Sequence, residues 1–98
     1  MSSYIGLMNW TDLGVRDYKE TVDRFEQAKK LAVQFGTEIK ETYWTPGGPY
    51  DLVCIMECPD QKRAAAFGLL LESMGNLRMT CADAFGPDEM RSVLAAGG

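Results

Sequence analysis

The segment from residue 50 to residue 57 constrains the fold of this chain more than any other. If it forms a strand, successive side chains point to opposite sides of the sheet. One side then carries Leu52, Cys54 and Met56, and the other carries Val53 and Ile55. Because both sides are apolar, the strand is typical of a sheet that is covered on both faces. We therefore expect a sheet with a cover on each face.

Three further segments read as strands because β-type residues alternate within them. Residues 4–10 place Ile5, Leu7 and Asn9 on one face and Tyr4, Gly6, Met8 and Trp10 on the other. Residues 38–45 place Ile39 and Tyr43 on one face and Thr42 and Trp44 on the other. The charges of Lys40 and Glu41 suit a strand at the edge of the sheet. The turn Pro46-Gly47-Gly48-Pro49 joins this strand to residues 50–57 as a hairpin, and residues 77–85 alternate weakly as a fourth strand.

Helical spacing separates these strands. From residue 15 onward, apolar residues recur at steps of three and four and predict an amphipathic helix; they are Val15, Tyr18, Val22, Phe25, Ala28, Ala32 and Phe35. Its start is open between an Asp17/Glu20 capping box and a cap at Thr21, whereas Gly36 marks its end. A second helix begins at Pro59-Asp60 and ends at Gly75-Asn76. A short last helix opens at residues 86–89 and reaches about Leu94, and residues 95–98 are expected to form a disordered tail.

The predicted order βαββαβ is the ferredoxin-like arrangement, an α+β fold in which both helices cover one face of a four-stranded antiparallel sheet. Ninety-eight residues are enough for one domain, residues 1–98, and too few for two independent cores. Two helices leave the second apolar face without a cover. We therefore expect self-association, a homo-oligomer formed through the open sheet face.

Composition argues against several classes of partner. Ten Lys and Arg against fourteen Asp and Glu give a formal net charge of −4, with no basic cluster, so nucleic acid is not an expected partner. The first residues lack the charge and apolar run of a signal peptide. The longest apolar stretch, Ala64–Leu71, is far below the roughly 20 residues that span a bilayer. We expect no membrane partner and a cytoplasmic protein.

The chain has no histidine and three cysteines, Cys54, Cys58 and Cys81, without a CxxC spacing. The absence of histidine removes His-ligated zinc, His-ligated haem and His-based catalytic triads. Cys54 and Cys81 lie inside strand-like runs, where cysteine usually acts as a small hydrophobic residue. We expect no metal and no cofactor, although a site of three thiolates and a role for the cysteines stay open.

Polar and aromatic residues gather where the predicted strands end. In the antiparallel arrangement, the end of residues 38–45, the start of residues 50–57 and the end of residues 4–10 meet at one end of the sheet. The candidate ligand-binding residues there are Asn9, Trp10, Tyr43, Trp44, Tyr50, Asp51 and Arg78. Aromatic walls with a few polar groups are typical of a small-molecule pocket, and Asp51 is the candidate general base. The alternative is structural: Asp51 hydrogen-bonds the backbone of its own turn, Tyr50 and Trp44 pack as a cross-strand aromatic pair, Asn9 ends a strand and Arg78 pairs with a carboxylate.

The combined motifs resemble the GYD domain family, small bacterial proteins named after a Gly-x-Tyr-Asp element. The resemblance rests on Leu7-Met8-Asn9-Trp10-Thr11, Lys40-Glu41, Tyr43-Trp44-Thr45, Gly48-Pro49-Tyr50-Asp51-Leu52-Val53, Gly75-Asn76-Leu77-Arg78 and Ala84-Phe85. One departure from the family pattern is the turn at residues 46–49, which is one residue longer than the turn usual in that family. The resemblance implies a ferredoxin-like domain that assembles as in the dimeric α+β barrel superfamily. It implies no activity and no catalytic residue.

Three functions follow as hypotheses. The leading one is an oligomeric domain of uncharacterised function that binds a small molecule in the aromatic pocket at the sheet end. The second is a cofactor-free enzyme, monooxygenase-like or isomerase-like, acting on a small aromatic substrate, by analogy with proteins that share the barrel superfamily. The third is a purely structural or regulatory assembly module. The residues leave open whether the protein is an enzyme, which ligand it binds and how many subunits assemble.

Overall fold

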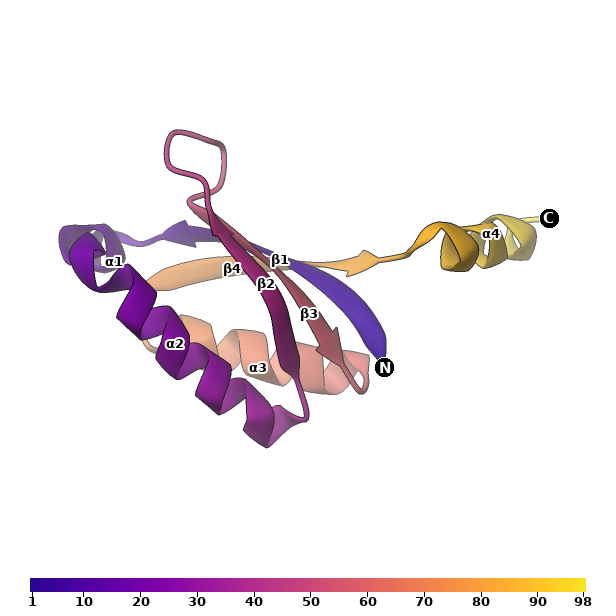
Figure 1. The fold of residues 1–98 in the computed structure, drawn as a ribbon, viewed down its shortest axis with the longest axis horizontal. Coiled ribbons are helices and arrows are strands. Elements are labelled where there is room, and N and C mark those ends of the chain that lie inside the picture. Colours follow the sequence, from indigo (N-terminus) through magenta and orange to yellow (C-terminus); the bar gives the residue numbers. More distant parts are fainter.

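A computed structural model describes residues 1–98 and shows one antiparallel sheet with two helices packed on one face (Figure 1). The sheet has the strand order β2-β3-β1-β4. Its strands are β1 (Ser2–Trp10), β2 (Glu38–Trp44), β3 (Leu52–Cys58) and β4 (Leu77–Ala84). The helices are α1 (Asp12–Arg16), α2 (Thr21–Ala32), α3 (Gln61–Ser73) and α4 (Pro87–Ala96). This arrangement confirms the predicted α+β, ferredoxin-like fold.

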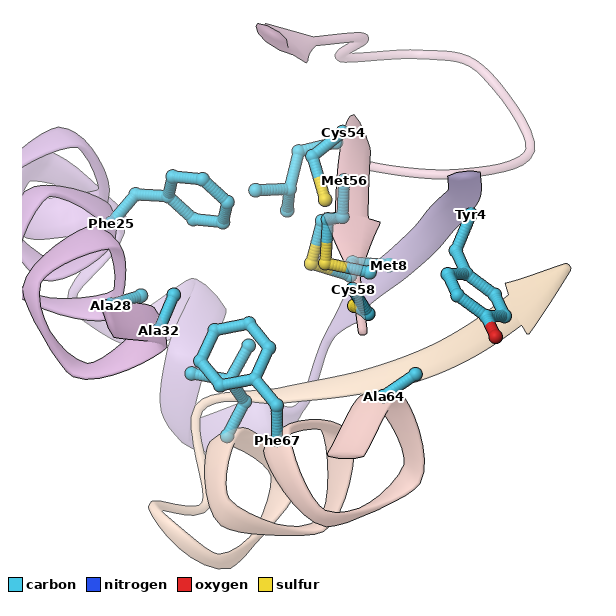
Figure 2. Close-up of a cluster of buried hydrophobic side chains, with 12 residues drawn as sticks. Tyr4, Met8, Phe25, Ala28, Ala32, Cys54, Met56, Cys58, Ala64 and Phe67 are labelled. Carbon is cyan, nitrogen blue, oxygen red and sulfur yellow. The ribbon is translucent and has the colours of Figure 1, made fainter. Parts of the chain in front are cut away.

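The two central strands, β1 and β3, carry most of the core. Met8 opposes Leu52 and Tyr4 opposes Met56 across the β1-β3 pair, and all four side chains are buried beneath the helices. Phe25, Ala28 and Ala32 of α2 and Ala64 and Phe67 of α3 belong to the same buried cluster, which Figure 2 shows. Full burial of large apolar side chains is the main favourable term in folding, roughly 1.5–3 kcal/mol for each. The core therefore lies between the helices and one face of the sheet.

The residues of β2 that lie on the helix-covered face are not the set that alternation predicted. The β2-β3 register shifts between Ile39 and Glu41, so Lys40 is an extra residue in a β-bulge. Because of the bulge, Ile39 shares the helix-covered face with Thr42 and Trp44 rather than with Tyr43. Simple alternation cannot anticipate this change, since one inserted residue reverses the side on which every later residue lies.

The first predicted helix is two helices joined by a 3₁₀ turn at Tyr18–Glu20. Thr11 caps α1, where its hydroxyl accepts a hydrogen bond from Gly14 N–H, and α2 begins at Thr21. The bend leaves Val15 and Tyr18 exposed, so the prediction that they join the core stripe is wrong. The predicted end is confirmed, because Gly36 takes the left-handed conformation with φ of 63°.

The face of the sheet away from α2 and α3 has no helix over it. Its central residues are Ile5 and Ile55, which are neighbours across the β1-β3 pair and are 36% and 38% exposed. Leu7 opposes Val53 one step along the same pair. We call this surface, residues 5, 7, 53 and 55 with their neighbours on β2 and β4, the open face. Self-association through it stays a prediction.

Candidate functional site

The seven predicted site residues all lie at one end of the sheet, but they divide between its two faces. Asn9, Tyr43 and Arg78 belong to the open face and are exposed. Trp10 and Trp44 lie on the helix-covered side and pack against the core. Tyr50 and Asp51 are half-buried in the β2-β3 connection. The structure therefore brings these residues to one end without forming a single pocket from all of them.

Asp51 is bonded into the backbone on three sides. Its carboxylate Oδ2 accepts a hydrogen bond from the Trp10 N–H at 2.8 Å, and its own N–H donates to the Met8 carbonyl at 2.9 Å. The Asp51 carbonyl also accepts from the Thr45 N–H at 2.8 Å. These bonds join β1 to the start of β3 and close the hairpin. The Asp51 carboxylate thus has a structural role, but it binds the backbone of β1 rather than that of its own turn, and its role as a general base stays a prediction.

The hairpin loop is fastened at a second point by Thr45. Its hydroxyl donates a hydrogen bond to the carbonyl of Tyr50, and its N–H donates to the carbonyl of Asp51. Gly47, within this loop, has a φ of 88°, a conformation that non-glycine residues rarely adopt. The contacts of Thr45 with Tyr50 and Asp51, together with the bond from Asp51 to Met8, therefore fix the end of this loop beside the end of β1.

Trp44 connects the sheet to the start of α2. Its indole Nε1–H donates to the Thr21 hydroxyl at 3.0 Å, and its ring meets Phe25 edge to face with centroids 5.9 Å apart. The structural alternative had proposed that Trp44 pairs with Tyr50. The structure pairs Trp44 with Phe25 of α2 instead. An edge-to-face aromatic pair adds about 0.5–1.5 kcal/mol beyond the burial of its surface.

A small cavity of about 40 Å³ lies behind this aromatic pair, between the helices and the sheet end. Trp10 is the one predicted residue in its wall. Its lining is Trp10, Thr21, Arg24, Phe25, Leu52, Leu71, Met74, Asn76 and Leu77. The space suits a few water molecules rather than a drug-sized ligand, which needs several hundred Å³.

Sequence reasoning missed Arg24 in this wall. Its guanidinium donates to the carbonyl of Gly14 at 3.0 Å and to that of Asp17 at 2.9 Å, which bonds the end of α1 to α2. Cationic side chains favour helix C-termini because the free carbonyls there carry partial negative charge. The sequence signal that could have found Arg24 is its position. It falls at helical spacing beside Phe25 and Ala28, so a charged residue interrupts the apolar stripe of the helix.

The open face offers a second arrangement at the same end. Asn9 on β1 lies directly opposite Arg78 on β4, and Leu7 and Val53 lie one step inward. Tyr43 pairs with Val53 from the other side and is 57% exposed. Side chains directly opposite in antiparallel strands have Cβ atoms roughly 4.5–5.5 Å apart, so an amide, a guanidinium and a phenol surround an apolar floor.

Arg78 takes part in none of the ion pairs of the molecule, which use Arg16, Lys29, Lys40, Arg63 and Arg91. The predicted alternative, in which Arg78 pairs with a carboxylate, is therefore wrong. An exposed guanidinium presents five N–H donors in a planar fork that matches a carboxylate or phosphate. The open face is thus chemically suited to an anion at this end.

Burial disfavours nucleophilic chemistry at two of the three thiols, Cys54 and Cys81. Burial raises the pKa of the Cys54 thiol to about 12, and burial also raises the pKa of Cys81. Cys58 is buried and accepts a hydrogen bond from the Thr37 hydroxyl. Since the thiolate is the reactive form, a raised pKa disfavours chemistry at neutral pH. No group of three or more Cys, Asp or Glu side chains is placed to hold a metal ion.

The fold and this site define a class, a small ferredoxin-like α+β domain whose sheet has one face packed by helices and one face open. None of its helices has the length and apolar character needed to cross a membrane. The sequence pattern of the GYD domain matches residues 4–94, nearly the whole chain. The chain therefore belongs to the GYD domain family. No curated protein matches the chain.

Proposed function

We propose that this protein is a small-molecule-binding domain that acts as a homo-oligomer and holds an anionic, partly apolar ligand on the open face. The observation that carries the proposal is the unpaired guanidinium of Arg78 beside Asn9, at the edge of the apolar floor made by Leu7 and Val53. A few polar groups around an apolar floor are the usual composition of a ligand site.

Charge favours an anion in this place. Although the whole chain carries a formal net charge of −4, Arg78 has no carboxylate partner, so its guanidinium is free to pair with an anion. A guanidinium binds a carboxylate through two parallel N–H···O bonds, which are stronger than neutral hydrogen bonds. Tyr43, across the floor, supplies an aromatic face for the apolar part of the same ligand.

The remaining predicted residues have a supporting part in this proposal. Asp51 and Tyr50 hold the hairpin loop beside the floor, and Trp10 and Trp44 support the same strands from the helix side. A site on rigid strands keeps its geometry better than one on a free loop. Truncation of these four residues should therefore weaken binding through the position of the strands rather than through lost ligand contacts.

A second copy of the chain is the proposed cover. Four strands about 4.8 Å apart and about eight residues long present a footprint of roughly 500 Å². Association would bury exposed neighbours such as Ile5 and Ile55. Each Å² of apolar surface that is removed from water stabilises the assembly by about 25 cal/mol. Two such faces packed together enclose the Arg78 end between them and exclude water, which strengthens its ion pair with a ligand.

The assembly is tested with two neighbouring lysine variants. Val53→Lys lies on the open face and should give a folded chain that associates more weakly, whereas Cys54→Lys puts a charge into the core and should abolish folding. Circular dichroism reports folding and native mass spectrometry reports subunit number. A wild-type chain that is a stable monomer at micromolar concentration would end the assembly proposal.

Ligand binding is tested with sodium benzoate, an anion with an apolar body, titrated into isotope-labelled protein and followed by NMR. Amide shifts should centre on Leu7, Asn9 and Arg78, and Arg78→Ala should weaken binding at least about tenfold, because a charge-assisted pair is lost. Arg63→Ala is the matched control, since Arg63 is also an exposed arginine but pairs with Asp60. Equal benzoate affinity in both variants would refute the proposed site. Native mass spectrometry of freshly purified protein adds the mass of any ligand retained from the cell.

A further inference from the structure

The last helix, α4, lies apart from the rest of its own chain. Figure 1 shows it beyond the end of the sheet, reached by a short connection that follows the end of β4. No other helix or strand packs extensively against it. The chain has a radius of gyration of 14.3 Å and a longest dimension of 48 Å. A compact domain of about 100 residues has a radius of gyration of about 13 Å, so α4 makes the molecule elongated.

One side of α4 is nevertheless apolar. At 100° for each residue, Met90, Val93 and Leu94 fall on one side of the helix, and Asp88, Ser92 and Ala95 on the other. Phe85 is exposed immediately before the helix, and Leu94 is 64% exposed. We call the side with Met90, Val93 and Leu94 the apolar side of α4. In one copy of the chain it faces solvent.

The chain has clear signals for a helix in this place. Pro87 occupies the first turn, where its fixed φ suits helix entry, and the Glu89 carboxylate accepts a hydrogen bond from the Gly86 N–H at 3.3 Å. Even so, an isolated helix of ten residues is only marginally stable in water, and most helices depend on packing of an apolar side. A helix with defined ends and an unpacked apolar side requires a surface to pack against.

We propose that α4 is an arm that packs its apolar side onto a second copy of this chain, at the border of that copy's open face. The inference rests on the assembly proposed above. The arm begins where β4 leaves the sheet, and Ala82 and Ala84 of β4 already belong to the open face. A second copy seated on the open face therefore lies beside the start of the arm, and the two contacts form one continuous surface.

The area involved supports exchange of arms between two copies. Two open faces of roughly 500 Å² each bury about 1,000 Å² together, which is at the lower limit for a specific interface. A ten-residue helix is about 15 Å long and about 10 Å wide, so each arm buries about 150 Å² and covers an equal area of its partner. Two arms add about 600 Å². The total of about 1,600 Å² is the size of a standard stable interface.

A lipid surface fits α4 poorly. Helices that lie on membranes usually carry several Lys or Arg residues on the polar side. The polar residues of α4 include Asp88 and Glu89 and a single basic residue, Arg91, which is paired with Asp88 at 2.7 Å. The observations therefore favour a second copy of the chain over an anionic bilayer.

The first test compares two double variants of the full chain. Val93→Glu with Leu94→Glu puts charge on the apolar side of α4, and Ser92→Glu with Ala95→Glu puts the same charge on the opposite side as the control. Sedimentation velocity over a concentration series gives the dimer dissociation constant of each. We expect the first variant to raise it at least about tenfold, since two large apolar contacts are lost, and the control to change it by less than about threefold. Equal dissociation constants for the two variants would overturn the inference.

The second test identifies what α4 touches. Leu94 is replaced by the photoreactive p-benzoylphenylalanine, and this protein is mixed with unmodified protein labelled with ¹⁵N before irradiation. Mass spectrometry should find peptides of α4 joined to ¹⁵N-labelled peptides from strands of the open face. Crosslinks that join α4 only to its own chain would overturn the arm, as would no crosslink at all.

Failure of the arm is distinguishable from failure of the sheet-face assembly. If Val53→Lys weakens the dimer and the apolar-side variant of α4 does not, the open face pairs without an arm and the inference is wrong. If the α4 variant dissociates the dimer while Val53→Lys leaves it intact, α4 joins the copies away from the open face, and both the sheet-face assembly and the proposed docking place of the arm are wrong. A dimer that both changes weaken supports both proposals.

Discussion

Gly14→Ala should destabilise this protein strongly although it adds only one methyl group to a helix. Gly14 is buried in α1, where the backbone passes against the turn that joins α3 to β4. A Cβ atom at this position would overlap the carbonyl oxygen of Asn76 and lie 2.9 Å from the carbonyl carbon. Backbone atoms cannot rotate aside as the end of a flexible side chain can, so the two segments must separate.

The magnitude follows from the bonds that hold these segments together. The Thr11 N–H donates to the Asn76 carbonyl at 3.1 Å, and the Thr11 hydroxyl donates to the Gly75 carbonyl. Losing both costs about 1–3 kcal/mol, and overpacking costs a further 1–3 kcal/mol or so. The better helix propensity of alanine returns at most about 1 kcal/mol. The net loss is about 1–5 kcal/mol, which for a chain of this size lowers Tm by roughly 4–40 °C.

Urea denaturation at fixed pH measures this loss, and Gly68→Ala is the matched control. Gly68 is also a buried helical glycine, but a Cβ there would meet only the terminal methyl of Met79, at 2.9 Å, which can rotate away. We expect the control to stay within about 1 kcal/mol of wild type, because its helix propensity improves. A Gly14→Ala chain as stable as the control would refute the close approach of α1 to the Asn76 turn.

Three further predictions concern the sheet end and the core. Asp51→Asn should stay within about 1 kcal/mol of wild type because an amide oxygen still accepts from the Trp10 N–H, whereas Asp51→Ala should lose about 1–3 kcal/mol in urea denaturation; equal losses would mean that the carboxylate charge matters. If Asp51 is a general base, Asp51→Asn should also abolish any turnover that is found. Trp44→Phe removes the donor to Thr21 and should cost about 0.5–1.5 kcal/mol with the fold intact by circular dichroism; an unchanged stability would contradict that bond. Burial raises the pKa of the Cys54 thiol from 9.0 to about 12, so the folded state holds this proton more tightly than the unfolded state does. The contribution of the Cys54 proton to stability is therefore full below about pH 9 and is lost as the pH rises toward 12. The loss is up to about 1.4 kcal/mol for each pH unit. Unfolding measured from pH 8 to 11 should show a shallower decline in Cys54→Ala, and parallel curves would contradict the burial effect.

Strands and helices that follow a simple period were predictable from residue type. Alternation in residues 4–10 and 50–57 anticipated β1 and β3, and Gly36 anticipated the end of the first helical segment. The failures have local causes. One bulged residue, Lys40, changed the face on which Ile39 lies relative to Tyr43, and the bend at residues 18–20 depends on bonds from Arg24 to carbonyls that alternation cannot locate.

The sequence predicted that the candidate residues lie at one end of the sheet, but not which of them share a face. Strand order alone brings the seven polar and aromatic residues to one end, as the structure shows. Which of them share a face depends on register and twist, and these separate Trp10 and Trp44 from Asn9 and Arg78. The bonds that occupy Asp51 join residues 41 positions apart in the chain, and no local pattern contains that information.

The sequence by itself determined the class of fold, because the periods of its apolar residues and its turn residues are local properties of the chain. It also determined that β3 is apolar on both sides, since Leu52, Cys54 and Met56 alternate with Val53 and Ile55. Only the tertiary structure decided which side the helices cover, that Arg78 has no carboxylate partner, and that no other helix or strand of the chain packs extensively against the apolar side of α4. These are relations between segments distant in sequence, and they are fixed by packing and register, which depend on the whole chain at once.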